Sequence, residues 1–460
     1  MIDNKIVILC PEIVPLDNKG EEAIIKGVMD IKGLKEDNCI YQVIDPSVRQ
    51  LTVRNGLYLH PSELFFSEWR TKEYGLGLSM ELIYNSVCAV VRHGLNHLYP
   101  QWINKRPSVV KRLIQYIKWY REGKTSKIPK KVVDSVRLIA NTDYIIAGHN
   151  GGLNENVCHL LLAFNEIGYH YTIFGSCMKP RVKEKFLLQL YDNTFSKSDN
   201  IISRNPIGFR WYQSHFDYPA ELKPDPAFYM NALNKECVDQ LIEKLGLVRF
   251  FTKKVIMITT AEPAPISLRA FDDYSTRIQK ISAHRKFLAS LLKRLLDETD
   301  LNVLFLPHTI GPQDNMDDRK ISKDAVRIAK LSNDSEGRCF VLEADLDCRQ
   351  LKGLISKAEI LVAERVHSLI GAVGVHTPFI CLASDKDTRV NGMLIELAGL
   401  GEYVYHLNHP VVDEAMKKIL FVMNNRASIS EKIAKLDENN RMQLNLVGNE
   451  IIIPRNERTY

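Results

Sequence analysis

Three potentially reactive side chains follow apolar runs in the carboxyl-terminal half of this sequence. Arg365 and His367 belong to a stretch, beginning at Glu364, that directly follows residues 360–363, and Lys386 comes shortly after residues 379–382. Each apolar run predicts a strand of a parallel sheet, and open α/β sheets bind their ligands at the carboxyl ends of such strands. Two cations and a titratable imidazole suit a substrate that carries phosphate and carboxylate groups and a reaction that moves a proton. The pattern therefore predicts an anion site at which His367 moves the proton.

Arg365 and His367 also have a purely structural interpretation. Arg365 could pair with a carboxylate on a neighbouring element, and His367 could be a hydrogen-bonded histidine of the core. Geometry adds a constraint, because residues two apart on a helix do not share a face. Both side chains therefore reach one ligand only if Arg365 lies in the turn or at the first helical position.

Several short motifs have the residue types and the order of a known enzyme family. They are Asn18-Lys19-Gly20-Glu21-Glu22-Ala23-Ile24, Ser203-Arg204-Asn205, Lys223-Pro224-Asp225-Pro226-Ala227-Phe228, Arg365-Val366-His367 and Asp385-Lys386. Together they resemble the polysaccharide pyruvyl transferase family, whose members show N-x-G-[DE], S-R-D, R-x-H and D-K at the corresponding points. Asn205 departs from the Asp that the family more often carries. The resemblance leaves residues from about 50 to 135, and those after about 410, without a counterpart.

The resemblance implies a donor, phosphoenolpyruvate, and an acceptor sugar of a cell-surface polysaccharide, an exopolysaccharide or a capsule, or of its lipid-linked precursor. Two hydroxyls of the sugar become bridged by a pyruvate ketal and phosphate is released, with no further cofactor. In such a reaction His367 is the candidate for proton transfer. The planar guanidinium groups of Arg365 and Arg204 suit the donor carboxylate and phosphate, and Lys386 suits the leaving phosphate.

Further residues are candidates for substrate binding. The start of the first predicted helix could orient sugar hydroxyls, although acids there also stabilise the helix end. A glycine pair in a strand-to-helix turn could cradle an anion or admit a sugar, but such pairs are more often conformational. Another histidine ends a strand of the second half, and a serine follows the R-x-H motif. The candidates are Asn18, Gly20, Glu21, His149, Gly151, Gly152, His308 and Ser368.

Metal ligands do not stand out in the sequence. His93 and His97 have the spacing of one helical face, but no third ligand with metal-like spacing accompanies them. The nine cysteines are scattered and without a C-x-x-C pair, which favours reduced, buried thiols. We therefore expect no metal.

Length and composition indicate an ordinary globular protein of two domains. The chain has 460 residues, of which 45% are apolar and 25% are charged. Its first residues lack the pattern of a signal peptide, and no apolar run is long enough to span a bilayer. We expect a cytoplasmic protein, with peripheral contact at the inner face of the membrane as a further option.

Strand-like and helix-like segments alternate along the chain. Predicted strands cover residues 5–10, 40–44, 144–147, 170–174 and 200–203, and then 254–258, 302–306, 339–342, 359–362, 379–382 and 403–407. This rhythm predicts an α/β fold with two Rossmann-like domains that face a cleft, the glycosyltransferase-B-like arrangement that the resemblance also implies. We expect an acceptor-side domain over residues 1–235, a donor-side domain over residues 250–410, and a bracing helix and tail over residues 411–460.

A basic helical insert over residues 61–137 interrupts the alternation. Between Lys105 and Lys131, ten Lys or Arg stand against one acid, Glu122, with aromatic and aliphatic residues between them. Such a helix can lie in a membrane interface beside anionic lipids. Alternatively, its apolar stripe packs on the domain while the lysines face water. Nucleic acid is not expected as a partner, since no recognised binding motif accompanies the run.

Two other functions remain open. A nucleotide-sugar-dependent glycosyltransferase on the same fold would also use phosphate-binding cations, but the second domain lacks the E-x7-E spacing. A non-catalytic, membrane-associated protein of polysaccharide assembly would use the basic insert and would bind no donor. The identity of the ligand that binds therefore separates the three functions.

Overall fold

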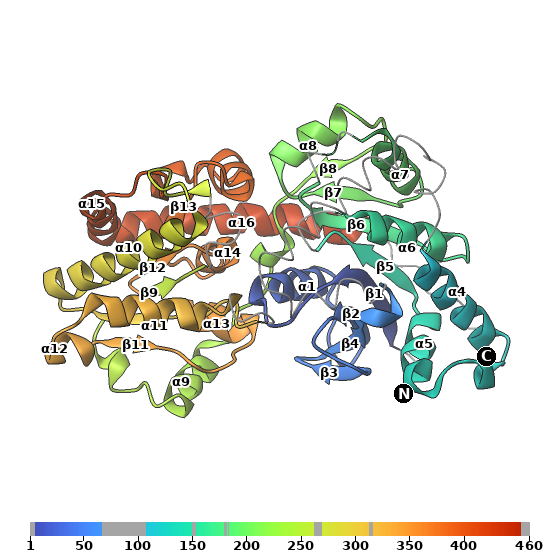
Figure 1. Cartoon of the computed structure of the whole chain (residues 1–460), viewed down its shortest axis with the longest axis horizontal. Coiled ribbons are helices and arrows are strands. Elements are labelled where there is room, and N and C mark those ends of the chain that lie inside the picture. The colour runs from blue at the N-terminus through green and yellow to red at the C-terminus, as the bar shows by residue number, and fades with distance from the viewer. Residues whose placement is uncertain are drawn as a thin grey trace. The chain divides into compact units, whose positions relative to one another are not determined.

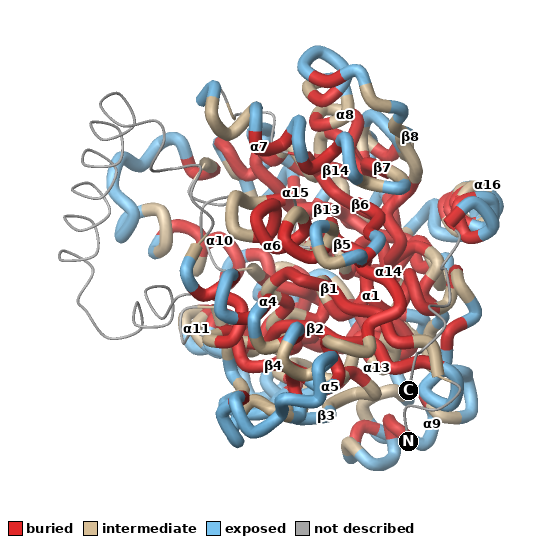
Figure 2. Tube along the Cα trace, turned by 90° about the vertical axis from the view of Figure 1, so that its right-hand side faces the viewer, coloured by how far each residue is buried: buried red, intermediate tan, exposed pale blue. Residues whose placement is uncertain are grey.

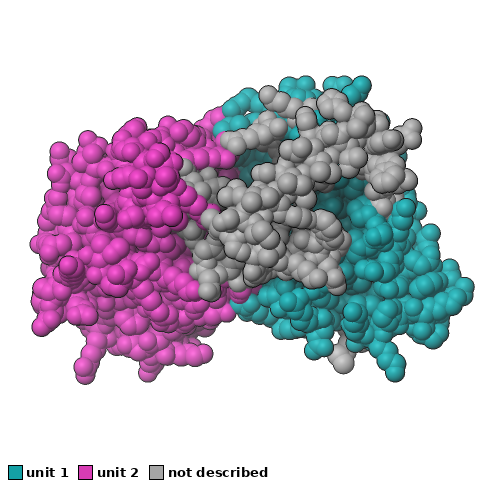
Figure 3. Space-filling view, in the orientation of Figure 1, with its two compact units in different colours: residues 1–15, 34–223, 450–460 teal, residues 16–33, 224–449 magenta. Residues whose placement is uncertain are grey.

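The computed structural model describes residues 5–66, 107–149, 153–178, 182, 184–261, 269–311 and 316–451. By compactness the chain divides into two units, which Figure 3 colours separately. Unit 1 comprises residues 1–15, 34–223 and 450–460, and unit 2 comprises residues 16–33 and 224–449. The sequence pattern groups residues 16–33 with the first sheet, whereas compactness groups them with the second, and the change of unit falls at residues 223 and 224.

Unit 1 is built on one sheet with the strand order β3-β4-β2-β1-β5-β6-β7-β8 (Figure 1). All neighbouring strands run parallel except β3 and β4. The strands are β1 (Ile6–Ile13), β2 (Cys39–Asp45), β3 (Thr52–Arg54), β4 (Leu57–Pro61), β5 (Tyr144–Ala147), β6 (Tyr171–Ser176), β7 (Ile201–Ser203) and β8 (Glu221–Leu222). Every residue of β2, β5 and β6 is buried, as expected for parallel strands covered on both faces.

The helices of unit 1 pack against this sheet. They are α4 (Ser108–Arg121), α5 (Val133–Ala140), α6 (Glu155–Asn165), α7 (Lys185–Phe195) and α8 (Pro206–Gln213), with 3₁₀ turns η1 (Ser62–Leu64), η3 (Thr125–Lys127) and η4 (Lys130–Val132). Helix α4 turns its apolar stripe into the core, where Val110, Leu113 and Ile117 are buried. Residues 122–127, which follow α4, are exposed, and Figure 2 colours the chain by burial. The packing interpretation of the basic helix is therefore confirmed for α4, and residues 67–106 of the predicted insert lie outside the described part.

Unit 2 has a second parallel sheet, with the order β11-β10-β9-β12-β13-β14. Its strands are β9 (Val255–Thr259), β10 (Asn302–Phe305), β11 (Cys339–Val341), β12 (Ile360–Ala363), β13 (Phe379–Ala383) and β14 (Val404–His406). Strand β9 pairs with β10 on one side and with β12 on the other, so the carboxyl ends of these three strands meet at one edge. Two histidine-containing segments, those of His308 and His367, begin at this edge.

Unit 2 carries more helices than unit 1 in the part of the chain that the structure describes. They are α1 (Lys19–Ile31), α9 (Lys235–Lys244), α10 (Arg277–Glu298), α11 (Asp318–Ala329), α12 (Asn333–Glu336), α13 (Cys348–Ile355), α14 (Val366–Val373), α15 (Val412–Asn424) and α16 (Arg426–Glu450), with 3₁₀ turns η5 (Pro226–Phe228), η6 (Phe250–Thr252) and η10 (Gly401–Tyr403) and a π-helix over Val390–Leu397. Helix α1 packs on η5, α13 and α14, which explains why it belongs to this unit. No described helix is both long and apolar enough to cross a membrane.

The strands that the sequence predicts in both halves are confirmed, with ends that differ by a few residues. Strands β3, β4 and β8 were not predicted. Strand β3 is short and largely exposed, and β8 has two residues, so neither offers a buried apolar run. The predicted carboxyl-terminal helical segment forms α15 and α16.

Candidate active site

His367 lies in the first turn of α14, directly after β12, and faces a buried carboxylate. Its Nε2 is 3.6 Å from Oδ2 of Asp225, whose side chain is fully buried, while 14% of the His367 side chain remains exposed. The other oxygen of Asp225 accepts the backbone N–H of Ala227 at 2.8 Å and thereby caps η5. A buried carboxylate that faces an imidazole stabilises the imidazolium form. The pair is therefore suited to hold a proton on a ring that remains partly exposed.

The amino end of α1 packs directly on the same ring. A Cβ atom placed at Gly20 would lie 2.3 Å from Nδ1 of His367, so only glycine fits there. Asn18 caps the helix, because its Oδ1 accepts the N–H of Gly20 at 3.2 Å while its Nδ2 donates to Oε1 of Glu21 at 3.2 Å. The cap is thus Asn18, with Glu21 and Glu22 in the first turn, and through Gly20 it also fixes the surface on which His367 rests.

Arg365 is the N-cap residue of α14, which is the position that allows it to share a ligand with His367. Its Nη2 donates to Oδ1 of the buried Asp318 at 2.5 Å, and its Nε donates to Oδ2 at 3.2 Å. The structural interpretation of Arg365 is thus confirmed, since it pairs with a carboxylate on a neighbouring helix. Nevertheless, 21% of its side chain is exposed, and its Nη1 takes no part in these bonds.

Asp318 joins the two histidine segments at the sheet edge. Its Oδ2 also accepts the backbone N–H groups of His308 at 3.0 Å and Thr309 at 2.8 Å. Burial raises the pKa of Asp318 to about 6, although Arg365 and the two amides act in the opposite direction. Arg365 and the backbone of His308 are therefore oriented by one carboxylate.

His308 is a buried histidine beside several cationic groups. Burial lowers its pKa well below the ordinary value, and His367, Arg365 and Lys19 lower it further. Its carbonyl accepts the backbone N–H of Lys19 at 3.0 Å. The structure thus brings together the predicted residues His308, Arg365 and His367 with the amino end of α1. His308 is held neutral there.

Two participants in this cluster were missed by the sequence analysis. The sequence motifs include Asp225 and Lys19, but no role is predicted for either residue from the sequence. Lys19 is buried and donates from Nζ to Oδ1 of Asp345 at 2.6 Å and to the carbonyl of Leu16 at 2.9 Å. The position of Lys19 within the N-K-G-E motif was the available signal for it, but its ion-pair partner, Asp345, lies far away along the chain.

Two other predicted residues of unit 2 have different surroundings. Nζ of Lys386 donates to Oδ2 of Asp272 at 3.0 Å, and about half of the lysine side chain is exposed. Hydrogen bonds from Asn408 and from Lys386 lower the pKa of Asp272 to about 2. The hydroxyl of Ser368 is fully buried and donates to the carbonyl of Arg365 at 2.6 Å, so it supports the turn.

Arg204 lies in unit 1 and is buried. Its Nε donates to Sγ of Cys177 at 3.1 Å, and its backbone N–H donates to the carbonyl of Ser176 at 3.0 Å. The next residue, Asn205, caps α8 by accepting the N–H of Ile207 at 2.9 Å. Asn and Asp cap helices about equally well, which accounts for Asn at a position where the family more often has Asp.

His149 is also buried in unit 1, where a carboxylate holds its turn. Oε2 of Glu12 accepts the backbone N–H groups of Gly148 at 2.7 Å and His149 at 2.5 Å. Nε2 of His149 lies 3.0 Å from the hydroxyl oxygen of Tyr41. Gly148 has a φ of 113°, which favours glycine. Gly151 and Gly152 lie outside the described residues.

Cys10, Glu12 and His149 form a buried trio that spacing could not reveal. Their potential ligand atoms lie within 4.8 Å of one another. Nδ1 of His149 lies 3.9 Å from Oε2 of Glu12, slightly farther than the roughly 3.3–3.8 Å that separates two ligands of tetrahedral zinc. Glu12 is already engaged with two amides, and we interpret the trio as structural. His93 and His97 lie outside the described residues.

Comparisons with known proteins identify the family of the chain and its fold. The family model "Polysaccharide pyruvyl transferase" matches residues 87–386. No curated protein sequence matches the chain. A Listeria monocytogenes structure described as a UDP-N-acetylglucosamine 2-epimerase is similar in fold, with a TM-score of 0.52 and 12% identity over 97% of this chain and 94% of that one. MurG of Acinetobacter baumannii aligns over 97% of this chain and 100% of its own, with a TM-score of 0.45 and 10% identity. The fold is thus α/β with two parallel sheets, like that of glycosyltransferase-B-like enzymes.

Proposed function

The chain belongs to the polysaccharide pyruvyl transferase family, and we propose that it transfers a pyruvyl group from phosphoenolpyruvate to a sugar of a cell-surface polysaccharide or of its lipid-linked precursor. The product is a pyruvate ketal, and phosphate is released. One observation carries the proposal: His367 stands at the sheet edge with the buried Asp225 behind it and Arg365 at the adjoining cap position.

The proposed reaction uses His367 as the proton donor. The imidazolium transfers its proton to the methylene carbon of the donor, and a sugar hydroxyl then bonds to the adjacent carbon as its own proton leaves to a base. The C–O bond to phosphate breaks, and the second hydroxyl closes the ketal and loses its proton in turn. Asp225 favours the charged ring before transfer, which supports this role for His367.

Cations compensate the charge of the donor in this proposal. The exposed part of Arg365 is suited to bind the donor carboxylate or phosphate, while its bonds to Asp318 keep the guanidinium in place. Lys386 would exchange Asp272 for the leaving phosphate, and Arg204 is retained as a donor-binding residue of unit 1. For binding the acceptor we retain Asn18, Glu21 and the Gly151-Gly152 pair as candidates, and we interpret the buried His149 as structural.

Ligand-dependent unfolding tests the choice of donor. We expect phosphoenolpyruvate to raise the melting temperature and uridine or guanosine diphosphate to leave it unchanged, because a ligand at 100 times its Kd stabilises by about 2.7 kcal/mol. Phosphate release with a saccharide acceptor then tests turnover. Stabilisation by a nucleoside diphosphate alone would favour the nucleotide-sugar glycosyltransferase.

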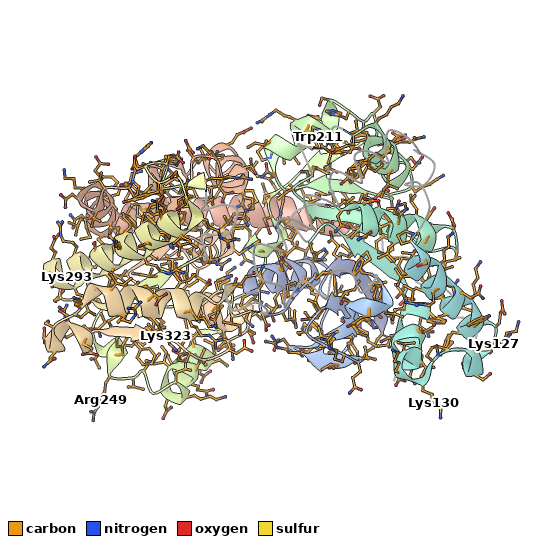
Figure 4. All side chains as sticks on the ribbon, viewed as in Figure 1. Lys127, Lys130, Trp211, Arg249, Lys293 and Lys323 are labelled. Atoms are coloured by element: carbon orange, nitrogen blue, oxygen red, sulfur yellow. The ribbon has the colours of Figure 1, made fainter. Side chains whose placement is uncertain are left out.

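We also propose contact with anionic lipid through a basic surface on unit 1. This surface consists of Lys111, Arg112, Lys118, Arg121, Lys124, Lys127, Lys130 and Lys131, all of which are exposed. Lys127 and Lys130 project outward from the unit (Figure 4). Because the apolar stripe of α4 is already packed in the core, the contact would be electrostatic, without insertion of this helix.

Vesicle flotation tests the basic surface. We expect binding to vesicles with anionic lipid, no binding to neutral vesicles, and release at high salt. Replacing Lys124, Lys127, Lys130 and Lys131 by Gln should abolish binding. Replacing four exposed lysines of unit 2, Lys253, Lys254, Lys293 and Lys323, by Gln is the matched control. Equal recovery with neutral and anionic vesicles would contradict the proposal, and lipid binding without donor binding would favour a non-catalytic assembly protein.

A further inference from the structure

Lys352, in α13, is a buried lysine that donates to the main chain behind Asp225. Its exposure is 1%. Nζ donates to the carbonyl of Met230 at 2.5 Å and to that of Phe228 at 3.4 Å. Phe228 ends the turn η5, which Asp225 begins as its N-cap residue. The lysine therefore holds the far end of the turn whose near end faces His367.

The same amine is seated against the end of α14, the helix that carries His367. A Cβ atom at Gly374, the C-cap residue of α14, would lie 2.3 Å from Nζ of Lys352 and 3.4 Å from the carbonyl oxygen of Phe228. A cation at the carboxyl end of a helix is favourably placed. The turn η5 and the helix α14 contact each other, with Asp225 and His367 at one end and Lys352 at the other.

Cationic side chains hold four successive carbonyls of this segment. Lys352 binds those of Phe228 and Met230, Arg441 donates to Tyr229 at 3.3 Å, and Arg349 donates to Asn231 at 2.9 Å. The segment has no sheet partner there, so side chains satisfy its carbonyl groups. Lys352 is the most deeply buried of the three cations, and its amine lies against Gly374 at the end of α14.

Helix α1 closes the other side of the turn. A Cβ atom at Gly27 would lie 2.0 Å from the carbonyl oxygen of Pro226, while Gly20 packs on His367. The turn is thus confined between backbone on one side and Lys352 on the other. A small displacement at Phe228 would be passed to Asp225, because only two residues separate them.

We propose that Lys352 is a positioning residue, which seats the η5 turn so that Asp225 faces His367. The expected effect of Lys352 on catalytic turnover rests on the proposed function, whereas its expected effect on the η5 segment does not. Burial of this lysine supports a dedicated role, since burial lowers its pKa to about 7 and such desolvation is unfavourable. A methionine of similar length would fill the space at lower cost, yet it would donate no hydrogen bond.

Kinetics of Lys352→Met form the first part of the test. We expect kcat to fall about tenfold to a hundredfold while KM for phosphoenolpyruvate changes little, because a displaced group alters the reacting geometry. In an Asp225→Asn background the same substitution should cause no further loss. Lys418→Met is the matched control, since Lys418 donates to the carbonyl of Val404 elsewhere in unit 2, and it should leave kcat unchanged. Additive losses in the double variant would overturn the proposal.

Amide hydrogen exchange forms the second part and requires no activity. In Lys352→Met, the amides of Ala227, Phe228 and Tyr229, which bond within the turn, should exchange at least about tenfold faster, and those of β12 should not. Gly374→Ala, which keeps the lysine but displaces its amine, should have the same effect if Lys352→Met fails to fold. Unchanged exchange in the turn would overturn the proposal. If exchange in the turn is faster in Lys352→Met but the wild-type protein transfers no pyruvyl group, the proposed function is refuted and the positioning role of Lys352 stands.

Discussion

In both units polar side chains lie at the carboxyl ends of parallel strands, but the two sets of side chains differ in their exposure to solvent. In unit 2 the side chains of His367 and Arg365 remain 14% and 21% exposed, and each is backed by a fully buried carboxylate. In unit 1 the comparable residues His149 and Arg204 are buried, with exposures of 0% and 2%. The carboxylates of unit 2 therefore support groups that can meet a ligand, whereas Glu12 of unit 1 supports a turn.

The difference lies in the exposure of the histidine ring that each carboxylate faces. In unit 1, Oε2 of Glu12 accepts two backbone amides and lies 3.9 Å from Nδ1 of His149, whose side chain is fully buried. In unit 2, one oxygen of Asp225 accepts a backbone amide and the other faces His367, so the main chain and a reactive ring are fixed together. A buried carboxylate becomes a sign of a reactive site when one of its partners is a side chain with an exposed edge.

The largest expected effect comes from the ring itself. His367→Asn should lower turnover on the order of a hundredfold or more, because the proton donor is lost while the turn remains. His149→Asn in unit 1 should lower the stability of the fold and change turnover little. Phosphate release and thermal melting measure the two quantities. An intact His149→Asn protein that loses turnover as strongly as His367→Asn would abolish the distinction between the units.

Removal of Arg365 should weaken donor binding and destabilise unit 2. Arg365→Ala leaves Asp318 buried without its cation, and we expect a loss of about 1–3 kcal/mol at pH 7.5 together with a Kd for phosphoenolpyruvate raised about tenfold. The pKa of Asp318 is already raised to about 6 and should rise further in the variant. When the pKa of a carboxyl group is higher in the folded state than in the unfolded state, the free energy of unfolding falls as the pH rises through the folded-state pKa. The loss of stability in Arg365→Ala should therefore be smaller at pH 5 than at pH 7.5.

Arg319→Ala is the control for this pH dependence. Arg319 pairs with Asp317 at 2.7 Å nearer the surface. Burial acts to raise the pKa of Asp317, but the bonds from Arg319 keep this pKa below its ordinary value. That carboxylate stays charged between pH 5 and 7.5, so this variant should show a deficit of less than about 1 kcal/mol at both pH values. Urea unfolding at the two pH values measures the contrast. A deficit of Arg365→Ala that does not depend on pH would contradict the account.

A smaller effect is expected from the carboxylate of unit 1. Glu12→Gln should destabilise the protein by about 1–2 kcal/mol, because charge-assisted bonds to the Gly148 and His149 amides become neutral ones. Donor affinity and turnover should change little. A fall in turnover at unchanged stability would show that this buried group serves chemistry after all.

The smallest effect is expected at Asn205. Asn205→Asp introduces the residue that the family more often carries, and both residues cap a helix. Stability should change by less than about 0.5 kcal/mol, and turnover should remain similar. A large gain in turnover would mean that this position takes part in the reaction through more than its cap.

The sequence predicted the two sheets well because buried parallel strands are continuous apolar runs. It also predicted Arg365, His367 and His308 at one edge, since carboxyl ends of neighbouring strands meet there. It could not predict that residues 16–33 join unit 2, because that contact depends on the close packing of Gly20 and Gly27. For the same reason it gave no role to Asp225 or Lys352, whose partners are distant along the chain and whose importance arises only from tertiary contacts.

Calorimetric titration of phosphoenolpyruvate into His367→Asn, beside the wild-type protein, tests the central claim most directly. If His367 moves a proton and Arg365 binds the anion, the variant should bind the donor with an affinity within about threefold of wild type and yet turn over at least about a hundredfold more slowly. Thermal melting should first establish that the variant is folded. A folded His367→Asn protein that turns over normally would remove His367 from the mechanism and leave it a histidine of the core.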